Sequence, residues 1–346
     1  MDRLTNNEIE FYAQKLKEAK AKLHKFIHEK KKPICTVLSQ KITDTWSMYH
    51  GDGVEVIKGI PSDSIHYSLF SPPFASLFVY SNSLRDMGNS QDGSFYEHFK
   101  FLIPELYRVL MPGRLLSFHC ADIPAMKERD GYMGLKDFPR KLLLMFEDAG
   151  FIKHSEVVIW KDPLLEAVRT KALGLAHKQI IKDSSRCRNG IPDKIITVHK
   201  PGENPEPIAH GRGFEEYIGE KAEPAARKND DPAINKYSHF VWQRYASPVW
   251  MDIRQTNTLN VKLAREKNDE RHICPLQLDT IARCLELWTN PGDIVLSPFA
   301  GIGSEGYGAL QKNRKFIGIE LKESYYKVAI ANLSKSQPAR LGIEKV

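Results

Sequence analysis

The sequence predicts an α/β protein in which helices cover both faces of a doubly wound sheet. Apolar runs typical of buried strands occur at Ile65–Phe70, Leu115–His119 and Val157–Trp160. Helical stretches lie between them, at Phe95–Leu110 and Phe138–Ala149. This alternation favours strands joined by crossover helices. With 346 residues, 42% of them hydrophobic, the chain is long enough to bury one large core with an added lobe.

A second group of elements lies near the C-terminus. A short strand runs into the turn Gly301-Ile302-Gly303-Ser304-Glu305-Gly306, which a helix follows to about Lys312. The next strand, Lys315–Ile319, ends in Glu320. A glycine turn lets the backbone approach a ligand closely, and a carboxylate at the tip of the following strand can accept both hydroxyls of a ribose. The order of these elements predicts a site for a nucleoside-type cofactor.

The position of this turn predicts a permuted sheet. A dinucleotide-binding domain needs several strand-helix units after its glycine turn, but only one strand and the helix Glu323–Leu333 follow here. The remaining strands must come from upstream. We therefore expect a doubly wound sheet whose strands follow one another along the chain in a circularly permuted order.

The tetrapeptide Ser71-Pro72-Pro73-Phe74 directly follows the first predicted strand. Two prolines cannot extend a sheet ladder, because neither has an N–H to donate. The Ser71 hydroxyl and the Pro72 carbonyl then form a rigid pair of acceptors that suits a planar ring with an NH2 group, and Phe74 can stack on that ring. The alternative is an ordinary turn. The cofactor site more than two hundred residues away favours the functional interpretation.

Together these motifs resemble the DNA amino-methyltransferases that use S-adenosylmethionine, in the permuted arrangement where the catalytic tetrapeptide comes first and the cofactor glycines last. The matching stretches are Gly51-Asp52, residues 60–65, Ser71 to Phe74, residues 108–113, residues 159–162, residues 272–276, and Ser297 through Glu320. The resemblance implies a Rossmann-like, circularly permuted methyltransferase sheet with an inserted target-recognition lobe. Ser in the first position of the tetrapeptide is typical of N4-cytosine enzymes, whereas Asp is typical of N6-adenine enzymes.

The resemblance also assigns the site residues. The catalytic set is Ser71, Pro72, Pro73 and Phe74, and the cofactor-binding set is Asp52, Phe299, Gly301, Gly303, Ser304 and Glu320. No metal is expected. An exposed turn or a helix N-cap is an equal alternative for Asp52. Ser297 departs from the family, which usually has Asp there, and Glu305 stands where Thr is common; the helix dipole favours a structural role for Glu305.

The implied reaction is direct, in-line methyl transfer. The exocyclic amine of a base is a poor nucleophile, because its lone pair is delocalised into the ring. Two acceptors that hold its hydrogens favour a pyramidal nitrogen and stabilise the positive charge that develops on it. In a duplex the base must first leave the stack. The alternatives are the same fold acting on adenine N6, or on an amide or a base in RNA, and a non-catalytic nucleic-acid-binding relative.

We expect four parts in the chain. Apolar residues at helical spacing predict an N-terminal helix (1–33). The resemblance implies a catalytic half (34–161), a target-recognition region (162–270) and a cofactor-binding half (271–346). Basic and aromatic residues of the third part suit contacts with DNA. For Phe240, Trp242 and Trp250 we instead expect the core of that lobe. Arginines that could read guanine are Arg186, Arg188, Arg212 and Arg244.

Composition is compatible with these expectations. Lys plus Arg total 50 and Asp plus Glu total 43, a formal charge of +7, which permits a polyanionic partner. The five cysteines lack zinc spacing and indicate reduced thiols. We expect no signal peptide and no membrane-spanning segment. We expect double-stranded DNA as partner, no membrane, and a bacterial or phage-encoded protein of the bacterial cytoplasm; the class also allows a homodimer and a cognate restriction endonuclease.

Overall fold

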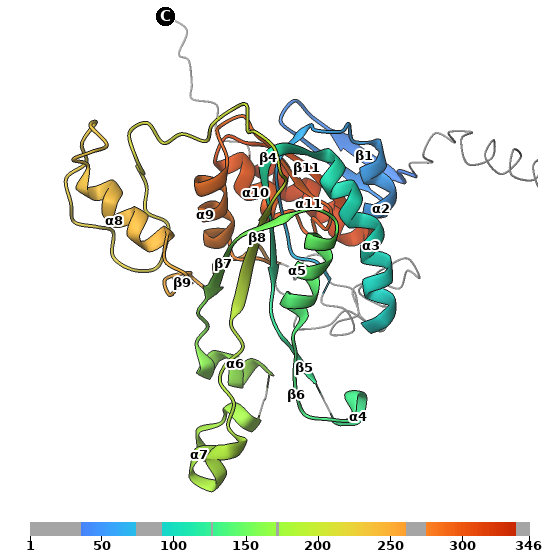
Figure 1. Ribbon diagram of the computed structural model, residues 1–346, viewed down its shortest axis with the longest axis vertical. Coiled ribbons are helices and arrows are strands. Elements are labelled where there is room, and N and C mark those ends of the chain that lie inside the picture. Colours follow the sequence, from blue (N-terminus) through green and yellow to red (C-terminus); the bar gives the residue numbers. More distant parts are fainter. Residues whose placement is uncertain (1–35, 74–91, 126, 171–172, 261–274, 337–346) are drawn as a thin grey trace, which may run out of the picture. The chain divides into compact units, whose positions relative to one another are not determined.

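The computed structural model describes residues 36–73, 92–125, 127–170, 173–260 and 275–336 (Figure 1). The chain divides into two compact units, Met1–Cys35 and Thr36–Val346. All that follows concerns the second unit. The predicted N-terminal helix and Phe74 of the tetrapeptide lie outside the described residues. No helix among the described residues is long and apolar enough to cross a membrane.

The described part of the second unit is built on a sheet of nine strands in the order β1-β2-β11-β10-β3-β4-β8-β7-β9. Its middle, from β2 to β4, is parallel throughout, and β8 runs antiparallel to both of its neighbours. The strands are β1 (Ser39–Ile42), β2 (Trp46–His50), β3 (Ile65–Phe70), β4 (Leu110–Cys120), β7 (Ile152–Ile159), β8 (Asp193–His199), β9 (Val249–Trp250), β10 (Ile294–Ser297) and β11 (Lys315–Glu320).

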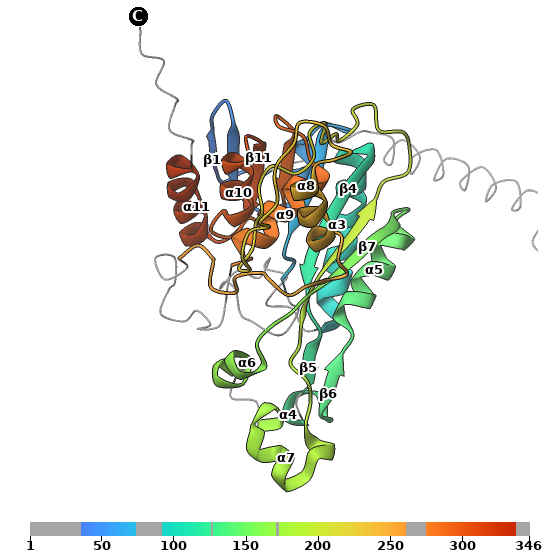
Figure 2. The same ribbon diagram turned by 90° about the vertical axis from the view of Figure 1, so that its left-hand side faces the viewer.

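Helices cover both faces of this sheet, as the sequence predicts (Figure 2). On one face α2 (Gly53–Val56), α3 (Asp92–Val109) and α5 (Phe138–Asp148) bury apolar side chains against the strands. On the other face α9 (Leu278–Trp288), α10 (Ser304–Gln311) and α11 (Glu323–Lys335) do the same. Each face has its own apolar cluster, so the sheet is buried on both sides over its parallel part.

The permuted order is visible in the strand pairing. β10 pairs with β3, and β11 pairs with β2, so the C-terminal segment supplies the middle of a sheet whose other strands come from upstream. Strands and helices form where predicted, with shifted ends. The predicted strand Leu115–His119 is the second half of β4, which begins before the Pro112-Gly113 turn. The strand predicted at Val157–Trp160 is the end of β7, which begins at Ile152 and stops at Ile159.

Strand β8 falls within residues 162–270, the region predicted for target recognition, but it pairs with β4 and β7 in the central sheet. The apolar residues Ile195, Ile196 and Val198 are buried there. Only the segments before and after β8 are therefore available for a separate lobe, and the region's function stays a prediction.

The segment before β8 holds α6 (Pro163–Thr170), η4 (Leu173–Leu175), α7 (His177–Asp183) and η5 (Ser184–Arg186). Together with the hairpin of β5 (Ile123–Ala125) and β6 (Gly134–Lys136) and with α4 (Lys127–Asp130), it extends beyond the edge where β3 and β4 end (Figures 1 and 2). Lys178, Lys182 and Arg186 are exposed on it.

The segment after β8 contains α8 (Lys236–Tyr245) and has a small core of Phe214, Ile218, Tyr237, Val241 and Tyr245. This corrects the expectation for three aromatic residues. Phe240 and Trp242 are 45% and 55% exposed, because they lie on the outer side of α8 rather than in its core. Trp250 is buried, but in the cluster between the sheet and α9.

Candidate active site

The predicted site residues gather at the carboxyl edge of the parallel strands. β2 ends before Gly51-Asp52, β3 before Ser71, β10 before the glycine turn, and β11 at Glu320. Parallel neighbours bring these ends together, and ligands of open α/β sheets bind at this edge. The structure thus brings together residues that lie at opposite ends of the sequence.

The glycine turn adopts a backbone that other residues rarely adopt. Gly301 and Gly303 have φ angles of 53° and 85°, and Gly303 is the N-cap of α10. A Cβ on Gly303 would lie 3.3 Å from Ala329 of α11. A Cβ on Gly306 would lie 2.5 Å from the Phe316 ring of β11. The first two glycines therefore shape the turn, and the third lets α10 lie close to the sheet.

Glu320 is held in place by backbone amides. Its Oε2 accepts from the N–H of Gly301 at 2.8 Å, and its Oε1 accepts from the N–H of Lys322 at 2.7 Å. A Cβ on Gly301 would meet nothing within 4 Å, so the turn has an open side at the carboxylate. Each carboxylate oxygen can accept a second hydrogen bond. This geometry fits a ribose whose hydroxyls donate to Glu320.

Asp52 has the local role that was one of its two predicted alternatives. Its Oδ1 accepts from the N–H of Val54 at 2.9 Å and caps α2. A contact of Asp52 with a cofactor stays a prediction. Phe299 is half-buried, and its ring lies 5.8 Å from that of Phe70 and 6.3 Å from that of Phe99. This ring thus lines the boundary between the two halves of the site.

Ser297 and Glu305, which the sequence sets apart, are both buried. Ser297 is fully buried, and the structure gives its hydroxyl no hydrogen-bond partner. Glu305, in the first turn of α10, is 4% exposed. Burial, with a smaller contribution from the charge of Glu320, raises the pKa of Glu305 to about 8. Glu305 is therefore a neutral acid at pH 7.

The Ser71 hydroxyl has a partner that the sequence did not suggest. Its Oγ lies 2.9 Å from Nδ1 of His119, the penultimate residue of β4. Nε2 of His119 lies 3.3 Å from a carboxylate oxygen of Asp193, at the start of β8. The other oxygen of Asp193 lies 2.5 Å from Nζ of Lys161. Pro72 is buried and Pro73 is half-buried beside this group.

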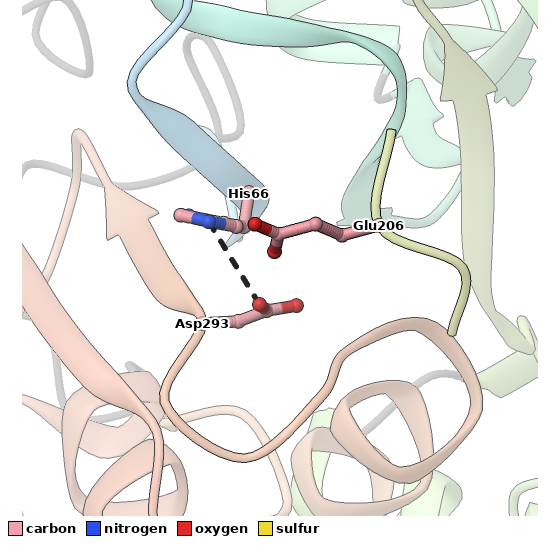
Figure 3. A group of neighbouring side chains, drawn as sticks. All are labelled: His66, Glu206 and Asp293. Carbon is pink, nitrogen blue, oxygen red and sulfur yellow. Dashed lines mark ion pairs between the residues drawn. The ribbon is translucent and has the colours of Figure 1, made fainter. Parts of the chain in front are cut away.

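A different group, His66, Glu206 and Asp293, has the composition of a metal site (Figure 3). It lies at the opposite edge of the sheet, where β3 and β10 begin. The fully buried Arg114 donates to Asp293 at 3.0 Å and lies 3.7 Å from Glu206. Nδ1 of His66 accepts from the N–H of Ile294 at 3.2 Å. A neutral imidazole then carries its proton on Nε2, so the group is a charge network centred on Arg114 rather than a set of metal ligands.

Comparison with known proteins agrees with the fold. Structures of the same fold include TTHA0409 of Thermus thermophilus, solved with S-adenosyl-L-methionine, at 19% identity and a TM-score of 0.56 over 84% of this chain and 96% of that one. The cytosine-N4-specific PvuII DNA methyltransferase matches at 15% identity and a TM-score of 0.56, over 89% and 92%. These matches define the class as the α/β methyltransferase fold.

Sequence comparison then gives the family. Residues 65–331 match the N6/N4 DNA methylase family, and the chain belongs to it. The type II methyltransferase M.BglI of Bacillus subtilis is 24% identical over 323 residues, which cover 83% of this chain and 85% of that protein. The family includes methyltransferases of both the N6 and the N4 amine, so membership leaves the target base open.

Proposed function

We propose that this protein transfers a methyl group from S-adenosylmethionine to the exocyclic N4 amine of cytosine in DNA. The observation that carries the proposal is the pairing of β3 with β10, in which Ser68 lies opposite Leu296. Ser71 and the glycine turn leave the sheet a few residues further on. Adjacent strands are about 4.8 Å apart, so a methyl donor at the turn and an amine at Ser71 would be neighbours.

The residues at the turn fit the cofactor. Glu320, oriented by two amides, would accept from the ribose hydroxyls, and the open side of Gly301 would admit the ligand against the backbone. The buried Ser297 hydroxyl offers a further polar group at the end of β10. When bound, S-adenosylmethionine would supply an electrophilic methyl group on a sulfonium.

The protein's own contribution is to hold and activate the amine. The Ser71 hydroxyl and the Pro72 carbonyl would accept its two hydrogens, which directs the nitrogen lone pair toward the methyl carbon. The same acceptors stabilise the charge that appears on nitrogen in the transition state. A fixed near-attack geometry supplies much of the remaining rate.

The choice of cytosine depends on Ser71, the first residue of the tetrapeptide. A hydroxyl there is typical of N4 enzymes, whereas adenine N6 methylation is the alternative that the family allows. The segment beyond the carboxyl edge, with exposed Lys178, Lys182 and Arg186, would contact the DNA backbone near the flipped base. Action in the bacterial cytoplasm, a homodimer and a partner endonuclease stay predictions.

Nucleoside mass spectrometry on DNA from a methylation-free bacterial host tests the proposal. Expression of the chain should produce N4-methylcytosine, and expression of the Ser71→Ala variant to the same level should not. N6-methyladenine instead would overturn the base while leaving the enzyme class. Absence of any modified base from cells that contain folded protein would contradict DNA methylation.

A further inference from the structure

Behind Ser71 lies a row of polar side chains that come from four separate segments. Ser71 follows β3, His119 lies at the end of β4, Asp193 starts β8 and Lys161 follows β7. The successive distances are 2.9 Å from Ser71 Oγ to His119 Nδ1, 3.3 Å from His119 Nε2 to Asp193, and 2.5 Å from Asp193 to Lys161. His119 is 8% exposed and Asp193 is 4% exposed, so water competes little with these contacts.

The charge of Asp193 determines which nitrogen of His119 carries the proton. Burial alone would raise the pKa of Asp193, but the neighbouring His119 and Lys161 hold it well below its ordinary value, so Asp193 is a carboxylate at neutral pH. The Asp193 carboxylate lies 3.3 Å from Nε2 of His119, and its negative charge there favours the tautomer with the proton on Nε2. Nδ1 then presents a lone pair, and the Ser71 hydroxyl donates to it.

We propose that His119 is a positioning residue with two roles. It accepts a hydrogen bond from the Ser71 hydroxyl, and by way of that hydroxyl it takes up the proton that the methylated amine releases. The inference rests on the proposed function. With its proton directed at Nδ1, Ser71 faces the substrate with lone pairs only. A hydroxyl that rotates freely can donate to an acceptor on the base or accept from an amine. The Ser71 hydroxyl can only accept, so it selects the amine.

The proton balance of the reaction then closes within the chain. The bond between the sulfonium sulfur and the methyl carbon breaks, its electron pair stays on sulfur, and the amine lone pair forms the new C–N bond. The nitrogen, now cationic, gives a proton to Ser71 Oγ while the Ser71 proton moves to Nδ1 of His119. The imidazolium that results faces the Asp193 carboxylate and returns its proton to solvent after turnover.

The test compares His119→Asn with wild type in single-turnover methyl transfer. The Asn amide can still hydrogen-bond Ser71 but cannot take a proton. Proton transfer to a positioned base typically contributes about 10²–10⁴-fold, so we expect a rate about 100-fold lower at pH 8 with unchanged affinity for S-adenosylmethionine. The control is His154→Asn, an exposed histidine of β7 near the opposite edge of the sheet, which should match wild type.

The solvent isotope effect separates a relay, in which His119 takes up the proton of Ser71, from a structural contact. The wild-type single-turnover rate should be lower in D2O than in H2O, and the rate of the His119→Asn variant should lose this difference. Asp193 and Lys161 lie beyond residue 119 in both proteins, so they do not produce a difference between them.

A measurement on the free protein tests the tautomer independently of activity. 15N NMR of histidine-labelled wild type should show His119 with its proton on Nε2. The signal is assigned by its loss in His119→Asn or, if that variant does not fold, in His119→Gln.

A proton on Nδ1, or equal rates for His119→Asn and wild type, would overturn the inference. If wild type methylates no base, the proposed function fails and the relay with it. If wild type is active but the variant is equally fast, only the relay fails.

Discussion

The buried carboxyl of Glu305 gives the sharpest stability prediction. Its folded-state pKa is about 8 against a reference of 4.5, because burial and the nearby Glu320 disfavour the charged form. Between these two values the folded protein keeps a proton that the unfolded chain releases. The contribution to stability is therefore complete below pH 4.5 and is lost as pH rises toward 8. Each pH unit in that window costs about 1.4 kcal/mol, so moving from pH 6 to pH 9 should cost about 3 kcal/mol.

The Glu305→Gln variant should remove this cost, because Gln has the shape of the protonated acid and does not titrate. Urea unfolding of both proteins at pH 6 and pH 9 gives the difference in free energy of unfolding at each pH. Other titrating groups are common to both proteins and cancel. Relative to wild type, the variant should gain about 3 kcal/mol between the two pH values. Glu323→Gln, at the exposed first turn of α11, is the control. An equal difference at both pH values would refute the reasoning.

Three further predictions concern the site and the opposite edge of the sheet. Glu320→Gln should weaken binding of S-adenosylmethionine about tenfold by calorimetry, because a carboxamide offers one acceptor where the carboxylate offers two; unchanged affinity would remove Glu320 from the site. Ser71→Ala should lower the single-turnover rate about 100-fold while cofactor affinity stays constant, and a loss of affinity would contradict its assigned role. Arg114→Met should lower the free energy of unfolding by about 3–5 kcal/mol, because Asp293 is left buried without its cation; a change below about 1 kcal/mol would contradict that pairing.

Much of the fold follows from local patterns in the sequence. The apolar run before Ser71, the glycine turn and the acid after the last strand each determine a local structure, and their order implies a permuted sheet. The strand β8 was missed, because its short apolar run lies in a segment whose basic and proline-rich composition suggested a lobe. Pairing with β4 and β7 is a long-range property that local propensity does not show.

The candidate site was only partly predictable for the same reason. The glycines, Glu320 and Ser71 were found because each stands in a recognisable motif. His119 and Asp193 have no motif, and their contact with Ser71 depends on strand order. One signal was available: His119 ends a predicted strand, as does the residue before Ser71, and polar residues at the ends of parallel neighbours lie together. Residue type predicts a core position for Phe240 and Trp242, but both lie on the outer side of α8 and are exposed.

Transfer of a labelled methyl group tests the central claim most directly. The purified protein is incubated with S-adenosylmethionine that carries a trideuterated methyl group and with DNA from a methylation-free host, and the nucleosides are then analysed by mass spectrometry. The account predicts trideuteromethyl on N4 of cytosine with wild type and, at an early time point, about 100-fold less with Ser71→Ala. Label on any other atom would contradict the assignment to cytosine N4, and equal label with both proteins would contradict the assignment of Ser71 as the residue that holds the target amine.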